Sequence, residues 1–72
     1  MSNQETVRFV VNGMEAACRK GLTLEDYLMV ADLEPQKVVV EVNGQIIKVE
    51  AFGTHELNAG DQVEIIHFVG GG

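Results

Sequence analysis

The sequence predicts an α+β fold in which a mixed β-sheet packs on one helix. Five runs rich in β-branched and apolar residues have the composition of strands, and one stretch has the spacing of an amphipathic helix. Two Asn-Gly pairs, which favour type I′ hairpin turns, separate neighbouring runs on either side of the helix. Two hairpins around one helix favour an α+β domain over alternating β–α units.

Length and charge restrict the function classes. The chain has 72 residues, which is the length of one domain. Five Lys and Arg against eleven Asp and Glu give a net charge of −6, so a nucleic acid is a poor partner and a basic protein surface a better one. The polar start does not have the pattern of a signal peptide, and no apolar run reaches the ~18 residues of a membrane span. We therefore expect a cytoplasmic protein with no membrane partner.

The first two strands are predicted at residues 7–11 and 14–18, joined by Asn12-Gly13 as an antiparallel hairpin. Cys18, the one cysteine of the chain, lies in the returning strand, so an internal disulfide is excluded. A small buried residue is the simpler interpretation of Cys18, and a reactive thiol is the alternative.

A helix is predicted to start at Leu24, with Thr23 as its N-cap and Asp26 in the capping-box position. Pro35 is expected to end this helix by about Leu33, after roughly ten residues. The apolar face of the helix is formed by residues at i, i+3, i+4 and i+7 spacing, namely Leu24, Tyr27, Leu28 and Ala31.

The second half of the chain contains another predicted hairpin. Residues 38–42 hold a run of β-branched residues that suits a central strand or one covered on both faces. Asn43-Gly44 then predicts a turn into a short strand at residues 45–49. Residues 50–57 are interpreted as a loop that accommodates a helical turn, and residues 58–61 as a tight turn.

The last strand is predicted at residues 62–69, beside the first strand. Because side chains alternate along a strand, Val63 and Ile65 should face the helix. Ile66 and Phe68 should then point to the opposite face, where no second layer is predicted to cover them. We interpret these two residues as part of an exposed apolar patch that docks a partner.

Three glycines follow the last strand: Gly70, Gly71 and Gly72. A glycine tail is thin and conformationally free, so it can enter a narrow channel. The α-carboxylate of Gly72 has no side chain beside it to hinder attack. We therefore divide the chain into a domain at residues 1–67 and a flexible tail at residues 68–72 that carries the reactive carboxylate. A frayed, inert terminus is the alternative interpretation.

This order of elements, with its Gly-Gly end, resembles the ubiquitin-like β-grasp fold. It is more specifically similar to the ThiS family, the sulfur carrier proteins of thiamine biosynthesis. The resemblance covers nearly the whole chain and is carried by short motifs: Val11-Asn12-Gly13, the helix at residues 24–28, Val40-Glu41-Val42-Asn43-Gly44, Gly60-Asp61-Gln62-Val63-Glu64-Ile65 and Val69-Gly70-Gly71-Gly72.

The resemblance implies a carrier that supplies no catalytic side chain and binds no permanent cofactor or metal. An E1-like adenylating enzyme would use ATP-Mg to adenylate Gly72. Sulfur from a cysteine-desulfurase-type persulfide donor would then give a thiocarboxylate, and thiazole synthase would take the sulfur into thiazole. Insertion of Gly70, Gly71 and Gly72 into the partner enzymes would bring the carboxylate to the site of reaction.

Four alternatives remain open from the sequence. The small subunit of molybdopterin synthase shares the fold and the Gly-Gly end, although prolines are often found there at the place of His67-Phe68. Carriers for cysteine or methionine synthesis, and a β-grasp interaction module with an inert tail, also fit the pattern. A metal or thiol enzyme built on Cys18, His55 and His67 lacks ligand-like spacing.

Overall fold

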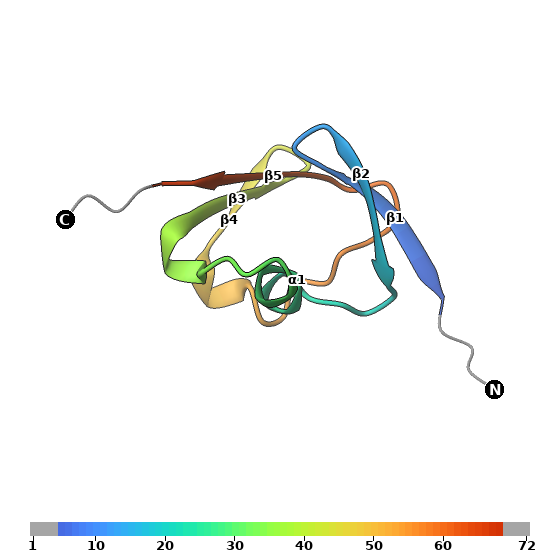
Figure 1. Cartoon of the computed structure of the whole chain (residues 1–72), viewed down its shortest axis with the longest axis horizontal. Helices are drawn as coiled ribbons and strands as arrows, with labels where there is room; N and C mark the ends of the chain where they lie inside the picture. The colour runs from blue at the N-terminus through green and yellow to red at the C-terminus, as the bar shows by residue number, and fades with distance from the viewer. Residues whose placement is uncertain (1–4, 69–72) are drawn as a thin grey trace.

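The computed structural model describes residues 5–68, in which a curved β-sheet covers one helix (Figure 1). One α-helix, α1 (Leu24–Val30), lies between the two hairpins in the sequence, and two short 3₁₀ turns, η1 (Pro35–Lys37) and η2 (Val49–Ala51), flank the second hairpin. The strands are β1 (Thr6–Val11), β2 (Met14–Arg19), β3 (Val38–Val42), β4 (Gln45–Ile47) and β5 (Gln62–His67).

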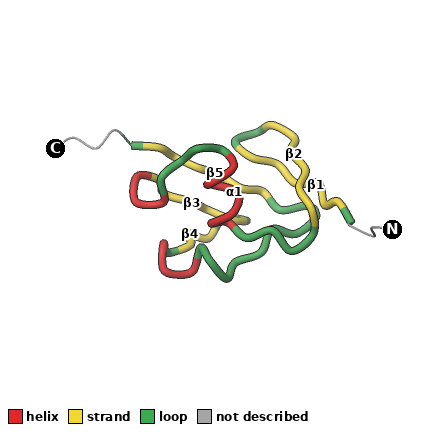
Figure 2. The backbone as a smooth tube through the Cα atoms, turned by 60° about the horizontal axis from the view of Figure 1, so that its bottom comes forward, coloured by secondary structure: helices red, strands yellow, loops and turns green. Residues whose placement is uncertain are grey.

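The strand order in the sheet is β2-β1-β5-β3-β4, so the last strand lies in the centre (Figure 2). β5 runs parallel to β1 and antiparallel to β3, and both hairpins are antiparallel. The predicted α+β class, the mixed sheet on one helix and the placement of the last strand beside the first are therefore confirmed. The division into a domain at residues 1–67 and a tail at 68–72 stays a prediction.

Both Asn-Gly pairs form the predicted hairpin turns. Asn12 and Gly13 have φ values of 50° and 80°, and Asn43 and Gly44 have 53° and 86°. Two successive positive φ angles are the signature of a type I′ turn, whose twist matches that of the strands it joins.

The start of α1 is the predicted capping box. The Thr23 hydroxyl accepts a hydrogen bond from the Asp26 N–H at 3.2 Å, and the Asp26 carboxylate accepts one from the Thr23 N–H at 3.3 Å. These reciprocal bonds satisfy two backbone donors that the first turn leaves without helical partners. Leu24 and Leu28 are fully buried beneath the sheet.

The end of α1 differs from the prediction. The helix has 7 residues and stops before Asp32, whose φ of 61° is left-handed. The Leu33 N–H donates to the Leu28 carbonyl at 2.8 Å and the Asp32 N–H donates to the Met29 carbonyl at 3.1 Å, which is the bonding of a Schellman motif. Pro35 does not end α1; it is the first residue of η1 instead.

The strand ends also differ from the prediction. β4 stops at Ile47 rather than at residue 49, because Val49 begins η2. β5 stops at His67, although the Phe68 N–H still donates to the Lys37 carbonyl at 3.0 Å. Val69 lies outside the described residues.

The core lies between α1 and the inner face of the sheet. Phe9 of β1 and Tyr27 of α1 pack edge to face, with ring centroids 5.8 Å apart. Among residues 5–68, no helix is long and apolar enough to cross a membrane. The buried apolar side chains of this part of the chain are Phe9, Leu24, Leu28, Val38, Val40, Val42, Phe52, Leu57, Val63 and Ile65.

Two of these core residues come from the segment interpreted as a loop. Phe52 and Leu57 are 3% and 1% exposed, so this segment contributes two side chains to the core although its other residues lie at or near the surface. The Leu57 N–H donates to the Leu22 carbonyl at 2.9 Å, and the Glu25 N–H donates to the Phe52 carbonyl at 3.1 Å. These bonds attach the segment to the start of α1.

Candidate docking surface on the outer face of the sheet

The central strand β5 presents different side chains to its two faces. Val63 and Ile65 are buried against α1, as the alternation of side chains predicts. Ile66 is 60% exposed and Phe68 is 45% exposed. The predicted directions of Val63, Ile65 and Ile66 are confirmed, and Phe68, which follows the end of β5, is exposed. The docking role of Ile66 and Phe68 stays a prediction.

Neighbouring strands add apolar side chains to the same face. Val39 of β3 lies directly opposite Ile66 in the antiparallel register. Ile46 of β4 lies opposite Glu41, and it is 66% exposed. Glu41 is two residues after Val39 on β3, so Ile46 and Val39 share one face of the sheet. We call the set Val39, Ile46, Ile66 and Phe68 the outer apolar strip. Exposed apolar side chains gathered on one face mark interaction surfaces more often than isolated ones do.

Two carboxylates lie beside the outer apolar strip. Glu41 and Glu64 are directly opposite each other on β3 and β5, where like charges are destabilising. The ion pairs found within residues 5–68 join Lys20 to Glu5 and Lys37 to Glu34, so neither Glu41 nor Glu64 is neutralised there. The surface therefore offers apolar contact next to negative charge, which fits a partner with basic groups around an apolar centre.

Polar side chains from both hairpin turns fix the position of β5. The Asn12 amide nitrogen donates to the Ile65 carbonyl at 3.1 Å, and its oxygen accepts from the Ile65 N–H at 2.8 Å. The Asn43 oxygen accepts from the Gln62 N–H at 2.9 Å, and the Asn43 nitrogen donates to the buried Asp61 carboxylate at 3.0 Å. The strand that leads to the C-terminal segment is therefore held from both sides.

The residues of the alternative thiol or metal site do not form one. Burial raises the pKa of the Cys18 thiol, and the nearby Arg19 opposes this effect, so a reactive thiolate is disfavoured. Cys18 is half-buried on β2, His55 is half-buried and His67 is exposed at the end of β5. Within residues 5–68, no three His, Cys, Asp or Glu side chains gather as they would around a metal ion.

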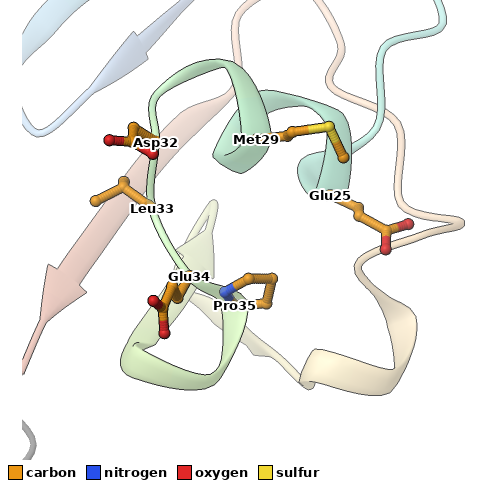
Figure 3. Close-up of a pocket in the computed structure, with 6 residues that line it drawn as sticks. All are labelled: Glu25, Met29, Asp32, Leu33, Glu34 and Pro35. Carbon is orange, nitrogen blue, oxygen red and sulfur yellow. The ribbon is translucent and has the colours of Figure 1, made fainter.

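A pocket lies on the helix side of the molecule, away from the outer apolar strip. Figure 3 shows its lining, which comes from α1 and from the segment that leads into η1. Three of the lining side chains are apolar, Met29, Leu33 and Pro35, and three are acidic, Glu25, Asp32 and Glu34.

Sequence reasoning missed Val39 and Ile46 as members of this surface. The run at residues 38–42 was interpreted as a strand covered on both faces or central in the sheet; β3 is an inner strand, but Val39 is 38% exposed. Val39 lies on the face of Ile66 only because β3 pairs antiparallel with β5, and the periodicity of one run does not reveal that pairing. Gly70, Gly71 and Gly72 lie outside the described residues.

The mixed five-stranded sheet over one helix is the fold of a ubiquitin-like β-grasp protein. The crystal structure of the thiamine biosynthesis protein ThiS from Geobacter metallireducens matches with a TM-score of 0.74 and 31% identity, over 92% of this chain and 100% of that one. The chain belongs to the ThiS family, whose model matches residues 2–72.

Two further relatives differ in how much of their length is matched. The sulfur carrier protein ThiS of Bacillus subtilis is 41% identical over 63 residues, which cover 86% of this chain and 96% of that protein. A thiazole synthase of Magnetococcus marinus is 39% identical over 62 residues, which cover 86% of this chain but 19% of that protein. The chain therefore spans about a fifth of the length of the thiazole synthases it matches.

Proposed function

We propose that this protein is a sulfur carrier of thiamine biosynthesis that holds sulfur as a thiocarboxylate at Gly72. The observation that carries the proposal is membership of the ThiS family, whose match extends through residue 72. The similarity to a sulfur carrier over nearly the whole length of both chains supports the same function. It also favours thiamine biosynthesis over the molybdopterin, cysteine and methionine alternatives.

The proposed chemistry activates one carboxyl group and then replaces AMP with sulfur. An E1-like adenylating enzyme joins the Gly72 carboxylate to the α-phosphate of ATP-Mg and releases pyrophosphate, which gives a mixed anhydride. The terminal sulfur of a cysteine persulfide, formed by a cysteine-desulfurase-type donor, then attacks the carbonyl carbon, and AMP leaves. A thiol cleaves the resulting S–S bond, which releases the thiocarboxylate and leaves a disulfide behind. No side chain of this chain takes a catalytic part, and it keeps no bound cofactor.

The outer apolar strip supplies the proposed docking surface for the adenylating enzyme and for thiazole synthase. Ile66 and Phe68 precede the glycines Gly70 and Gly71, so a partner that holds this strip is close to the tail it must receive. Glu41 and Glu64 add the charge that steers a basic partner surface. Segments similar to this chain within thiazole synthases support a direct association of the carrier with that enzyme.

Intact mass spectrometry of the protein isolated from cells tests the proposed function. We expect a fraction in which one oxygen is replaced by sulfur, located by fragmentation to Gly72. The matched control is the same protein from cells that lack the adenylating enzyme, which should contain the carboxylate form alone. Absence of the sulfur form during active thiamine synthesis, or sulfur located on Cys18, would contradict the proposal.

A further inference from the structure

β2 lies at one end of the sheet, beside β1 (Figure 2). Within residues 5–68, no strand pairs with its other side. An edge strand carries a row of backbone donors and acceptors that a further strand can use.

Backbone hydrogen bonds identify the groups that point outward from β2. The Lys20 N–H donates to the Glu5 carbonyl at 2.8 Å. In an antiparallel hairpin every second residue bonds to the partner strand, so Cys18, Ala16 and Met14 of β2 also bond to β1. The intervening residues of β1 bond to its other neighbour: the Val10 N–H donates to Asp61, for example, at 2.9 Å. The backbone groups that point away from β1 are therefore those of Glu15, Ala17 and Arg19.

The side chains of these three residues share the outer face of the sheet. Glu15 and Arg19 are exposed and have opposite charges, and the small Ala17 lies midway between them. Neither charged side chain makes an ion pair within the described part of the chain. When a second copy of this strand runs in the opposite direction, the acidic residue of each copy can lie opposite the basic residue of the other.

We propose that β2 pairs antiparallel with β2 of a second copy of this chain, with the two-fold axis at Ala17. In this register Glu15 lies opposite the partner's Arg19, and Arg19 lies opposite the partner's Glu15. Ala17 meets its own equivalent, where the absence of a large side chain permits close approach. The inner-face residue Ala16 lies opposite the partner's Cys18.

Backbone geometry and charge select this register among the alternatives. Paired residues must share a face and point their backbone groups at each other, so the register can change only in steps of two residues. A step in either direction removes both Glu15–Arg19 pairs and leaves one outward-pointing residue unmatched. The Arg19 carbonyl already accepts a bond from the Leu22 N–H at 3.2 Å, but the Ala17 groups and the Arg19 N–H are free of such bonds within residues 5–68.

The features that usually block such pairing do not do so on β2. Natural edge strands are protected by Pro, by bulges or by charged side chains, above all Lys. β2 has a continuous register with β1 from residue 14 to residue 19, and in the proposed register each of its two charged side chains lies opposite a residue of the other sign. Pairing at this edge would also leave the outer apolar strip open. The strip lies on the same face of the sheet, but on and after β5 and on β3 and β4, which β1 separates from β2.

Sedimentation equilibrium of charge variants tests the proposal. A single pair of edge strands belongs with weak interfaces below about 1,200 Å², so the measurement should extend to about 1 mM protein. We expect a monomer–dimer equilibrium for the natural chain. Glu15→Arg or Arg19→Glu alone should weaken the dimer by about tenfold or more, because like charges then face each other twice. The charge swap Glu15→Arg with Arg19→Glu should restore it.

A disulfide cross-link tests the register independently. Ala16→Cys places a thiol opposite the partner's Cys18 in a closely spaced pair, and mild oxidation should yield a dimer held by two disulfides. The matched control combines Ala16→Cys with Cys18→Ser and should yield little cross-linked dimer. A natural chain that stays monomeric at the highest concentration, or a dimer insensitive to both single charge variants, would overturn the proposal. So would equal cross-linking of the control.

Discussion

The side-chain amide of Asn12 forms both of its hydrogen bonds with the backbone of one residue, Ile65, at 2.8 and 3.1 Å. Parallel pairing of β1 with β5 covers Val10 and Val11 and ends at the hairpin turn. The Asn12 side chain therefore continues the hydrogen bonding between β1 and β5 beyond the point where the backbone of β1 enters the hairpin turn. This relation holds the central strand at the residue before Ile66, so the turn of the first hairpin also positions the candidate docking surface.

Asn12→Gly should lower the free energy of unfolding by about 1–3 kcal/mol, because it removes two partly buried hydrogen bonds. Glycine accepts the φ of 50° at this position, so the change isolates the amide from the turn. Urea unfolding measures the effect. Asn12→Asp keeps the acceptor but sets a carboxylate oxygen against the Ile65 carbonyl, so it should lower stability as well. Equal stability of all three proteins would show that the amide does not hold β5.

Asp32→Gly should raise the free energy of unfolding by about 0.5–1 kcal/mol, because glycine adopts the left-handed C′ conformation of a Schellman motif without strain. Ala31→Gly is the matched control. Ala31 has a φ of −82°, so that change should lower stability instead. Thermal unfolding compares the two variants, and a loss of stability in Asp32→Gly would mean that the aspartate side chain contributes more than the strain costs.

The elements governed by local signals were predictable from the sequence, and those governed by tertiary contacts were not. The Asn12-Gly13 turn and the Thr23–Asp26 capping box depend on neighbouring residues, and both are as predicted. The end of α1 was assigned to Pro35 because a left-handed Asp32 leaves little trace in a sequence. Phe52 was overlooked for a different reason: its burial depends on contact with α1, and the segment around it has no strand or helix period.

Only the part of the candidate docking surface that lies on the last predicted strand was predictable from the sequence, because only that part depends on local alternation. Alternation along one strand placed Ile66 and Phe68 on the outer face, which required no knowledge of the neighbouring strands. Val39 and Glu41 join that surface only through the register of β3 against β5, which spans more than twenty residues of sequence. Periodicity within one run cannot supply such a register.

Glu64→Gln should raise the free energy of unfolding by about 0.2–1 kcal/mol, because it removes repulsion with the facing Glu41. The same change should slow association with the adenylating enzyme, most strongly at low salt, if Glu64 faces a basic surface. Stopped-flow association at two ionic strengths separates the effects. Glu56→Gln changes an exposed carboxylate outside the sheet and should alter neither quantity. Faster association of Glu64→Gln would contradict the assigned polarity of the partner.

Phe68→Ala should weaken binding to the adenylating enzyme by more than about 1 kcal/mol while the free energy of unfolding changes little. The ring is 45% exposed, and the hydrogen bond that this residue donates to Lys37 comes from its backbone and survives the change. Isothermal titration calorimetry and thermal unfolding provide the two measurements. Met29→Ala, which truncates a 71% exposed side chain on α1, should leave binding intact. A collapse of stability in Phe68→Ala would instead identify the ring as a core residue.

Gly71→Val should block adenylation of Gly72, because a branched Cβ widens the tail and restricts its backbone as it enters the partner's active site. Residues added after Gly72 should abolish the reaction outright, since they replace the reacting carboxylate with a peptide bond and displace the new terminus. Cys18→Ser and His67→Ala should keep nearly full activity, because neither side chain is assigned any chemistry. Exchange of labelled pyrophosphate into ATP, catalysed by the adenylating enzyme and dependent on each variant, measures this step before sulfur is involved. Normal exchange with an extended tail, or loss of exchange specific to Cys18→Ser, would falsify the carrier mechanism and return the thiol to consideration as the reactive group.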